Sequence, residues 1–106
     1  EELLSIATSL RIESGTPIKR VSFIQRFCQN FEEEYDHYLQ AGFARVKQEW
    51  EANSYSIGRW VTVQTISQKL EGQAVGLDEE GVLMVEDRAG QIHKVYSADV
   101  NYRANV

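Results

Sequence analysis

The chain has 106 residues, 42% of them hydrophobic, and a formal net charge of −5. One cysteine excludes an internal disulfide, no apolar run approaches the roughly 18 residues of a membrane-spanning helix, and the acidic balance argues against a generic binder of nucleic-acid phosphates. The opening EELLS lacks the basic region of a secretory signal peptide, so we expect a cytoplasmic protein that acts without a membrane.

Apolar residues follow a helical spacing up to about residue 54. A first helical face is formed by Leu3, Leu4, Ala7 and Leu10. Gly15 and Pro17 separate it from a second helix, whose apolar stripe runs for about five turns from Phe23 to Leu39. Gly42 marks a helix end or a bend. A short third helical face then contains Phe43, Val46 and Trp50.

Beyond residue 54 the pattern changes to short strands separated by Gly, Asp and Ser. The strand-like segments are RWVTVQTI, KLEGQAVGL, GVLMVE and QIHKVYS. Four or five strands in about 45 residues are typical of a small curled antiparallel sheet or barrel. We expect an α+β chain in which the sheet leans on the helices, because so small a sheet has little core of its own. Trp50 and Trp60 flank the junction and are expected there.

The acid-rich stretch GLDEEGVLMVED invites comparison with a calcium-binding loop. Such a loop needs acids at alternate positions, glycine at the sixth position and glutamate at the twelfth. Counting from Asp78, the sixth residue is Leu83 and the twelfth is Ala89, so the pattern fails. Between apolar strands, Gly81 and Gly90 instead predict tight turns that need a positive φ. We therefore expect turns here, and no metal.

Residue types that often carry catalysis are placed unfavourably. Cys28 lies on the apolar stripe of the long helix and is expected to be a buried packing residue. His37 lies too far along that helix to activate the thiol, and with His93 in a strand no zinc-binding spacing exists. The acids of FEEEYDHY face solvent on a helix and share no cleft. These residues predict an accessory or interaction module, or a piece of something larger, without a complete active site.

Five segments, taken in order, carry a resemblance to one family. They are IATSL at residues 6–10, YDHYLQAGFARVKQEWEANS, IGRWVTV, LEGQAVGLDEEGVLMVE and VYSADV. In this order they resemble the C-terminal part of a bacterial biotin protein ligase, a family that includes the bifunctional ligase that represses biotin genes. The resemblance covers Leu4 to about Arg103.

The resemblance implies an activity for the parent enzyme. Members of the family join biotin to ATP, with magnesium, to give biotinyl-5′-AMP and then transfer biotin to one lysine of a carboxylase carrier domain. Their Gly-Arg-Gly-Arg motif and catalytic lysine have no counterpart in this sequence. We therefore expect no catalytic residue in this chain, no biotin or ATP bound by it alone, and no activity of the fragment by itself.

The resemblance also implies a domain organisation. Residues 1–54 correspond to the last helices of the family's catalytic domain, and residues 55–106 to a C-terminal SH3-like barrel. The implied partner is the biotin carboxyl carrier protein. DNA is read in repressor members by an N-terminal domain that this sequence lacks, and homodimers form chiefly through the catalytic-domain sheet, so we expect a monomeric or weakly associating fragment.

Two residues near the end match a further family feature. The family has an acid and, four residues later, an arginine on the nucleotide side, and Asp99 and Arg103 have this spacing. An arginine binds phosphate bidentately and an acid orients it. The other interpretation is a surface Asp at a strand end followed by a terminal Arg.

A second function for the whole chain also remains open, namely a free-standing SH3-like module that binds a peptide or protein in the groove of its barrel.

Overall fold

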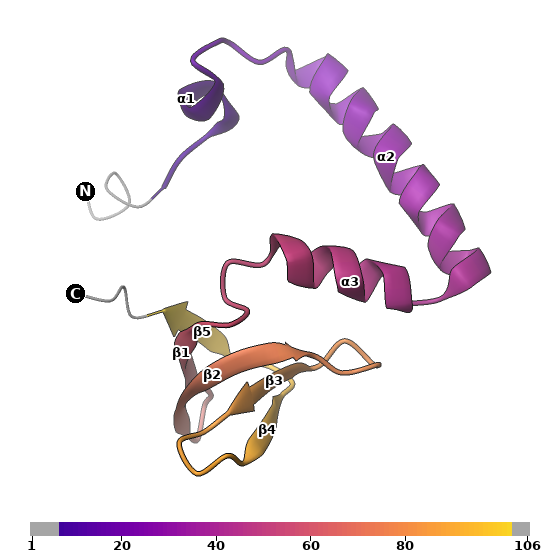
Figure 1. Ribbon diagram of the computed structural model, residues 1–106. Helices are drawn as coiled ribbons and strands as arrows, with labels where there is room; N and C mark the ends of the chain where they lie inside the picture. Colours follow the sequence, from indigo (N-terminus) through magenta and orange to yellow (C-terminus); the bar gives the residue numbers. More distant parts are fainter. Residues whose placement is uncertain (1–6, 103–106) are drawn as a thin grey trace. The chain divides into compact units, whose positions relative to one another are not determined.

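The computed structural model describes residues 7–102 (Figure 1). Its elements are α1 (Leu10–Ser14), α2 (Arg20–Ala41), α3 (Ala44–Asn53), β1 (Trp60–Gln64), β2 (Lys69–Leu77), β3 (Leu83–Glu86), β4 (Ile92–Val95) and β5 (Asp99–Tyr102). The expected α+β order, helices first and an antiparallel sheet after them, is confirmed. By its internal contacts the chain divides into two compact units, Glu1–His37 and Tyr38–Val106. The domain boundary expected after residue 54 stays a prediction.

The first unit contains α1 and most of α2. Ser9 caps α1 by accepting a hydrogen bond from the Ile12 amide at 3.2 Å. Gly15 ends the helix with a φ of 69° and donates its N–H to the Arg11 carbonyl. The expected face of the first helix lies partly on Leu3 and Leu4, which fall outside the described residues. The long second helix is confirmed as the 22 residues of α2.

The apolar side of α2 is exposed along its length. Five of its large side chains keep 46–61% of their surface accessible: Phe23 46%, Ile24 57%, Phe27 61%, Phe31 60% and Tyr35 50%. Three of these rings form a stacked ladder, with centroids 6.5 Å apart from Phe27 to Phe31 and 6.1 Å apart from Phe31 to Tyr35. The expectation that Cys28 is buried is wrong: the thiol is free and exposed, because the helical face that carries it is left uncovered.

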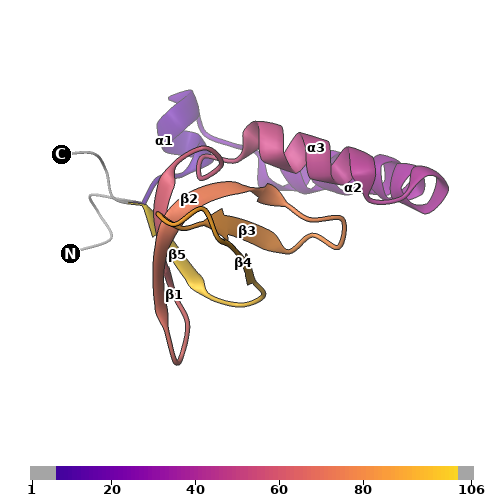
Figure 2. The same ribbon diagram turned by 60° about the horizontal axis from the view of Figure 1, so that its bottom comes forward.

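The second unit is built on one antiparallel sheet with the strand order β4-β3-β2-β1-β5. The strands follow one another as hairpins, and β5 then returns to pair with β1, as between Val63 and Val100. The sheet curls strongly (Figure 2). This arrangement agrees with the expected SH3-like fold, although β4 and β5 remain the edges of the described sheet and do not close it into a barrel.

The core of this sheet is small and aliphatic. Its fully buried members are Val61, Val63, Ala74 and Val85, and half-buried residues pack around them: Ile57, Leu70, Leu83, Val95, Ala98 and Val100. Two glycines of β2, Gly72 and Gly76, allow the curl. A Cβ on Gly72 would lie 2.4 Å from the Glu86 carbonyl oxygen, so only glycine permits this close approach of β2 and β3. Gly76 has a φ of 151° where a bulge shifts the register.

Helix α3 packs against β2 through a carboxylate. Glu51 Oε1 accepts a hydrogen bond from the Leu77 amide at 2.7 Å and occupies the space that a Cβ on Gly76 would need, at 2.8 Å. The Phe43 ring lies 3.1 Å from the corresponding position on Gly81. These contacts form the junction between helix and sheet, whereas Trp50 keeps 46% of its surface exposed. Among the described helices, none is long and apolar enough to cross a membrane.

Candidate functional site

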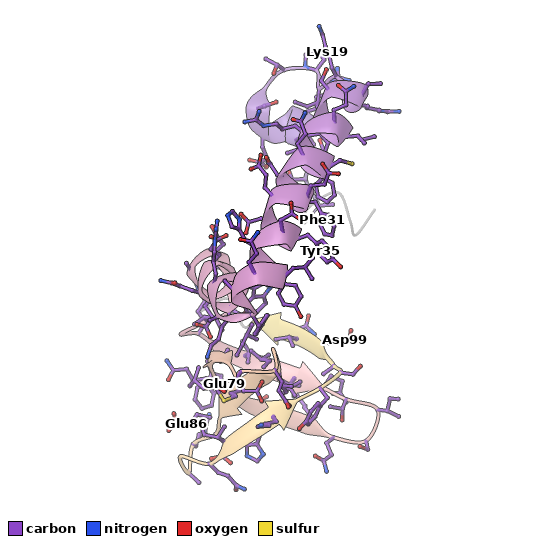
Figure 3. The ribbon with its side chains drawn as sticks, turned by 90° about the vertical axis from the view of Figure 1, so that its right-hand side faces the viewer. Lys19, Phe31, Tyr35, Glu79, Glu86 and Asp99 are labelled. Carbon is purple, nitrogen blue, oxygen red and sulfur yellow. The ribbon has the colours of Figure 1, made fainter. Side chains whose placement is uncertain are left out.

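Asp99 lies at the start of edge strand β5 and is paired in register with Gln64 on β1. It lines an open crevice of about 560 Å³, which the β1–β2 turn and the segment before β5 form together. The crevice is lined by Gln64, Thr65, Ile66, Ser67, Ser97, Ala98 and Asp99. Figure 3 places Asp99 well apart from Glu79 and Glu86 of the acid-rich stretch. Asp99 is therefore the acid of this crevice.

The β1–β2 turn gives the crevice a defined wall. Thr65 and Gln68 bond to each other across the turn: the Gln68 amide donates to Thr65 Oγ1 at 2.9 Å, and the Thr65 amide and hydroxyl donate to the Gln68 carbonyl at 2.8 and 3.1 Å. The Gln64 side-chain amide donates to the Thr65 carbonyl at 2.9 Å. Ile66 at the tip is fully exposed. The turn thus presents hydroxyl and amide groups on a fixed backbone, with an apolar tip beside them.

A second crevice of about 690 Å³ adjoins the first and shares Thr65, Ser67 and Ser97 with it. It opens onto β2 and β4, where Lys69 and Lys94 contribute positive charge. Both ammonium groups are already paired. Lys69 Nζ lies 3.2 Å from Glu71 Oε1, and Lys94 Nζ lies 2.7 Å from Asp78 Oδ2. The two adjoining crevices therefore combine hydroxyl groups, the Asp99 carboxylate and two lysines that already form ion pairs.

This arrangement suits binding better than catalysis. Within the described part of the chain the Asp99 carboxylate has no hydrogen-bond partner, so it is available to accept from hydroxyl or amino groups of a ligand. Arg103, the other expected residue, lies outside the described residues. Among residues 7–102, no cluster of three or more His, Cys, Asp or Glu could hold a metal ion.

The acid-rich stretch forms two turns built in the same way. Asp78 Oδ1 accepts from the amides of Glu80 and Val82, each at 2.9 Å, and Gly81 has a φ of 85°. Asp87 Oδ1 accepts from the amides of Ala89 and Gln91, at 2.8 and 3.0 Å, and Gly90 has a φ of 79°. The predicted turns are confirmed, and each is closed by an aspartate that bonds the backbone two and four residues ahead.

Neighbouring residues of β4 complete both turns. Lys94 donates to Asp78 as described, and His93 Nε2 lies 2.7 Å from Asp87 Oδ2. The hydrogen bond from Lys94 and those from the backbone lower the pKa of Asp78 to about 2, and the same kinds of bonds from His93 and the backbone lower the pKa of Asp87. In return Asp78 raises the pKa of Lys94. The sequence contains a signal for this pairing, because two Asp-x-x-Gly segments precede the adjacent His93 and Lys94. The sequence pattern alone had predicted the turns and not these partners.

Comparison with known proteins shows which class of protein the chain resembles. Residues 56–102, which contain all five strands, match the family described as "Biotin protein ligase C terminal domain". Four solved structures of biotin protein ligase from Aquifex aeolicus share the fold. One of them matches with a TM-score of 0.87 at 22% identity, over 97% of this chain and 46% of that chain. Another, solved in complex with biotin and ATP, matches with a TM-score of 0.82 at 23% identity.

More similar sequences extend the match to the helices. The "Bifunctional ligase/repressor BirA" of Bacillus spizizenii (strain ATCC 23059 / NRRL B-14472 / W23) is 41% identical over 100 residues, and that of Bacillus subtilis (strain 168) is 40% identical over 100 residues. Each match covers 94% of this chain and 30% of the relative, so the chain spans less than a third of the length of these proteins. Together these matches support the expected resemblance to the C-terminal part of a biotin protein ligase.

Proposed function

We propose that this chain serves as the C-terminal module of an ATP-dependent biotin protein ligase. The parent enzyme first joins the biotin carboxylate to the α-phosphate of ATP, which releases pyrophosphate and gives biotinyl-5′-AMP. A lysine amine of a biotin carboxyl carrier protein then attacks the activated carbonyl and releases AMP. The observation that carries the proposal is the 41% identity over 94% of the chain to a ligase/repressor. Because the match includes the helices, it favours a ligase module over a free-standing SH3-like module.

The module on its own is proposed to be inactive. The described residues contain no cluster of three or more His, Cys, Asp or Glu that could hold a metal ion, and the sequence has no Gly-Arg-Gly-Arg motif. Incubation of the isolated chain with biotin, MgATP and a carrier domain is therefore expected to leave the carrier unmodified. Biotinylation above the level seen without the chain, measured by mass spectrometry, would contradict this part of the proposal.

Within the parent enzyme the crevice at Asp99 is proposed to face the nucleotide. A carboxylate without a hydrogen-bond partner among residues 7–102 accepts hydrogen bonds from the ribose hydroxyls or the adenine amino group of ATP, and Arg103 is proposed to bind phosphate. Magnesium, when present, would reach the site with ATP. The proposed place of action is the cytoplasm, in keeping with the single, unpaired cysteine.

Asp99→Asn in a complete ligase is expected to raise the KM for ATP by about 10- to 150-fold, as one lost hydrogen bond to a charged group predicts. The KM for the carrier domain should stay unchanged. Glu80→Gln, an exposed change of the same chemistry in the β2–β3 turn, is the matched control. Equal ATP kinetics for Asp99→Asn and Glu80→Gln would remove Asp99 from the nucleotide side.

The other proposed partners follow the family. The relatives are named ligase/repressors, and DNA binding is proposed only for a separate N-terminal domain. A homodimer is proposed for the complete protein and not for this chain. The whole proposal is tested by a graft in which residues 7–106 of this chain replace the matching region of Bacillus subtilis BirA. Transfer of biotin to the carrier by the graft is expected, and an inactive but folded graft would contradict the proposal.

A further inference from the structure

The arginine–aromatic patch, defined as Tyr55, Arg59, Trp60 and Arg88, is a surface of the sheet unit that the proposed function leaves unused. All four residues lie in the second compact unit. The guanidinium carbon of Arg59 lies 3.7 Å from the centre of the Tyr55 ring, and that of Arg88 lies 5.6 Å from the centre of the Trp60 ring. Tyr, Trp and Arg are the residue types that contribute most binding energy in protein interfaces, so this composition marks an interaction surface.

The backbone holds both arginines in fixed places. Arg59 precedes β1, where its carbonyl accepts a hydrogen bond from the Ala74 amide at 2.9 Å and its amide donates to the Ser56 carbonyl at 3.0 Å. Arg88 lies in the β3–β4 turn, which the Asp87 carboxylate closes. Each guanidinium is therefore presented on a fixed backbone and over an aromatic ring, which reduces the conformational entropy that is lost on binding.

The charge of the patch is not neutralised from within the described chain. Among residues 7–102, neither Arg59 nor Arg88 forms an ion pair, although the whole chain has a net charge of −5. By contrast, Arg45, Lys69 and Lys94 of the same unit each lie against a carboxylate. Arg59 and Arg88 are both exposed. Their N–H groups are available for bidentate bonds to carboxylates that come from outside the chain.

The patch and the crevice at Asp99 lie at opposite ends of β1. Trp60 begins this strand, whereas Gln64, the partner of Asp99, ends it, and a strand of this length spans roughly 13 Å. Trp60 and Glu86 both pair in register with Gln73, and Figure 3 shows Glu86 well apart from Asp99. A partner bound to the patch therefore leaves the crevice open.

We propose that the arginine–aromatic patch docks an acidic segment of a second protein, one that presents carboxylates beside an aromatic or aliphatic side chain. The carboxylates bind Arg59 and Arg88, and the apolar side chain packs on the rings and on the exposed Val75 of β2. Nucleic acid is a poorer match, because its dense phosphates are repelled by a chain with a net charge of −5. The inference concerns a surface that the proposed nucleotide site does not use, so it can fail without affecting the proposed function.

The experiment titrates the 106-residue chain with a capped peptide of glutamates around a central phenylalanine, and with a matched peptide in which every glutamate is glutamine. Isothermal titration calorimetry measures the affinity, and backbone and indole N–H signals in NMR spectra locate the site. The acidic peptide is expected to bind at least about tenfold more tightly than the matched peptide. It should shift the signals of Trp60 and Arg88 and leave that of Asp99 unchanged.

Substitutions test the two guanidinium groups directly. Arg59→Gln with Arg88→Gln is expected to weaken binding of the acidic peptide at least about tenfold, because both charged contacts are lost. Arg45→Gln removes an exposed arginine that pairs with Glu49, and this control should bind like the unaltered chain. Glu86→Gln should tighten binding by about two- to fivefold, because it removes a carboxylate from the same row of the sheet. Circular dichroism melts check that each variant is folded.

Each outcome supports or overturns the docking surface. Equal affinity for the two peptides, or shifts confined to residues outside the patch, would overturn it even if a variant fails to fold. Binding that survives the double substitution in a folded chain would do the same. A short DNA duplex that binds with the same dependence on the two arginines would assign the patch to nucleic acid. A dimer in sedimentation that the double substitution dissociates would assign it to a second copy of this chain, and both results also overturn the inference.

Discussion

At the scale of single residues, charge and backbone conformation are coupled in the hairpin turns. Asp78 holds two backbone amides and one ammonium group, and this lowers its pKa from 3.8 to about 2. A carboxyl with a lowered pKa stabilises the folded state at pH values above its ordinary pKa. That contribution is lost as the pH falls from about 4 towards 2, because the unfolded chain takes up the proton first.

Asp78→Asn is therefore expected to lower the melting temperature at pH 7 by a few degrees and to flatten its dependence on pH between about 4 and 2. Circular dichroism melts across this range measure both effects. Glu79→Gln, an exposed acid in the same turn, should keep the acid sensitivity of the original chain. An unchanged acid profile for Asp78→Asn would show that the Lys94 pair does not stabilise the fold.

Gly76 and Glu51 form a second close contact at the scale of single residues. A side chain at position 76 meets both an unfavourable φ of 151° and the Glu51 carboxylate. Gly76→Ala is expected to destabilise the second unit by about 1–3 kcal/mol. Glu51→Ala combined with Gly76→Ala should cost less than the sum of the two single changes, because the clash disappears with the carboxylate. Additive costs in urea unfolding would contradict the contact.

At the scale of elements, the sequence predicted the positions of the long helix and the strands well and the burial of side chains poorly. The long helix and the strands follow from spacings of three to four and of two, which are local properties. The burial of Cys28 was predicted wrongly because an apolar stripe indicates that a face is to be covered, but not whether the covering part belongs to the same chain. The junction was assigned to Trp50 and Trp60, whereas the contacts in the structure come from Glu51, which bonds the Leu77 amide, and from the Phe43 ring against Gly81.

Site prediction had the same limit. Asp99 was selected by its resemblance to a family pattern, and the structure adds the crevice around it. The hydroxyl wall from the β1–β2 turn could not be predicted, because it depends on how residues 65–68 come to lie beside residues 97–99. The pairing of His93 and Lys94 with two separate turns likewise depends on the strand register. In strands this short, the sequence alone does not show which register will form.

The close approach of β2 and β3 gives an element-scale prediction. Gly72→Ala would bring a methyl group within 2.4 Å of the Glu86 carbonyl oxygen and 2.7 Å of Val85 Cγ1, so the strands must separate. We expect a loss of stability of about 1–3 kcal/mol, as for other overpacked cores, measured by the fluorescence of Trp50 and Trp60 in urea. Val75→Ala, on an exposed position of the same strand, is the control and should cost much less.

At the scale of the whole molecule, the chain combines a small self-contained sheet with a helix whose apolar face is uncovered. The sheet has its own core and family match, whereas α2 has no buried residue in the described structure. Both features are in keeping with the proposed role as the C-terminal module of a ligase, and the curated relatives are more than three times as long as this chain.

The most direct test of this account is the rate of biotin transfer to a carrier domain by Bacillus subtilis BirA whose matching region has been replaced by residues 7–106. The account predicts transfer within about tenfold of the unaltered relative, because 40% identity over 100 residues preserves the fold. In a second graft, residues 55–106 alone replace the whole matching region. Biotin transfer by this graft should be much slower, since it lacks α2. A complete graft that folds and binds biotin but transfers none would contradict the account.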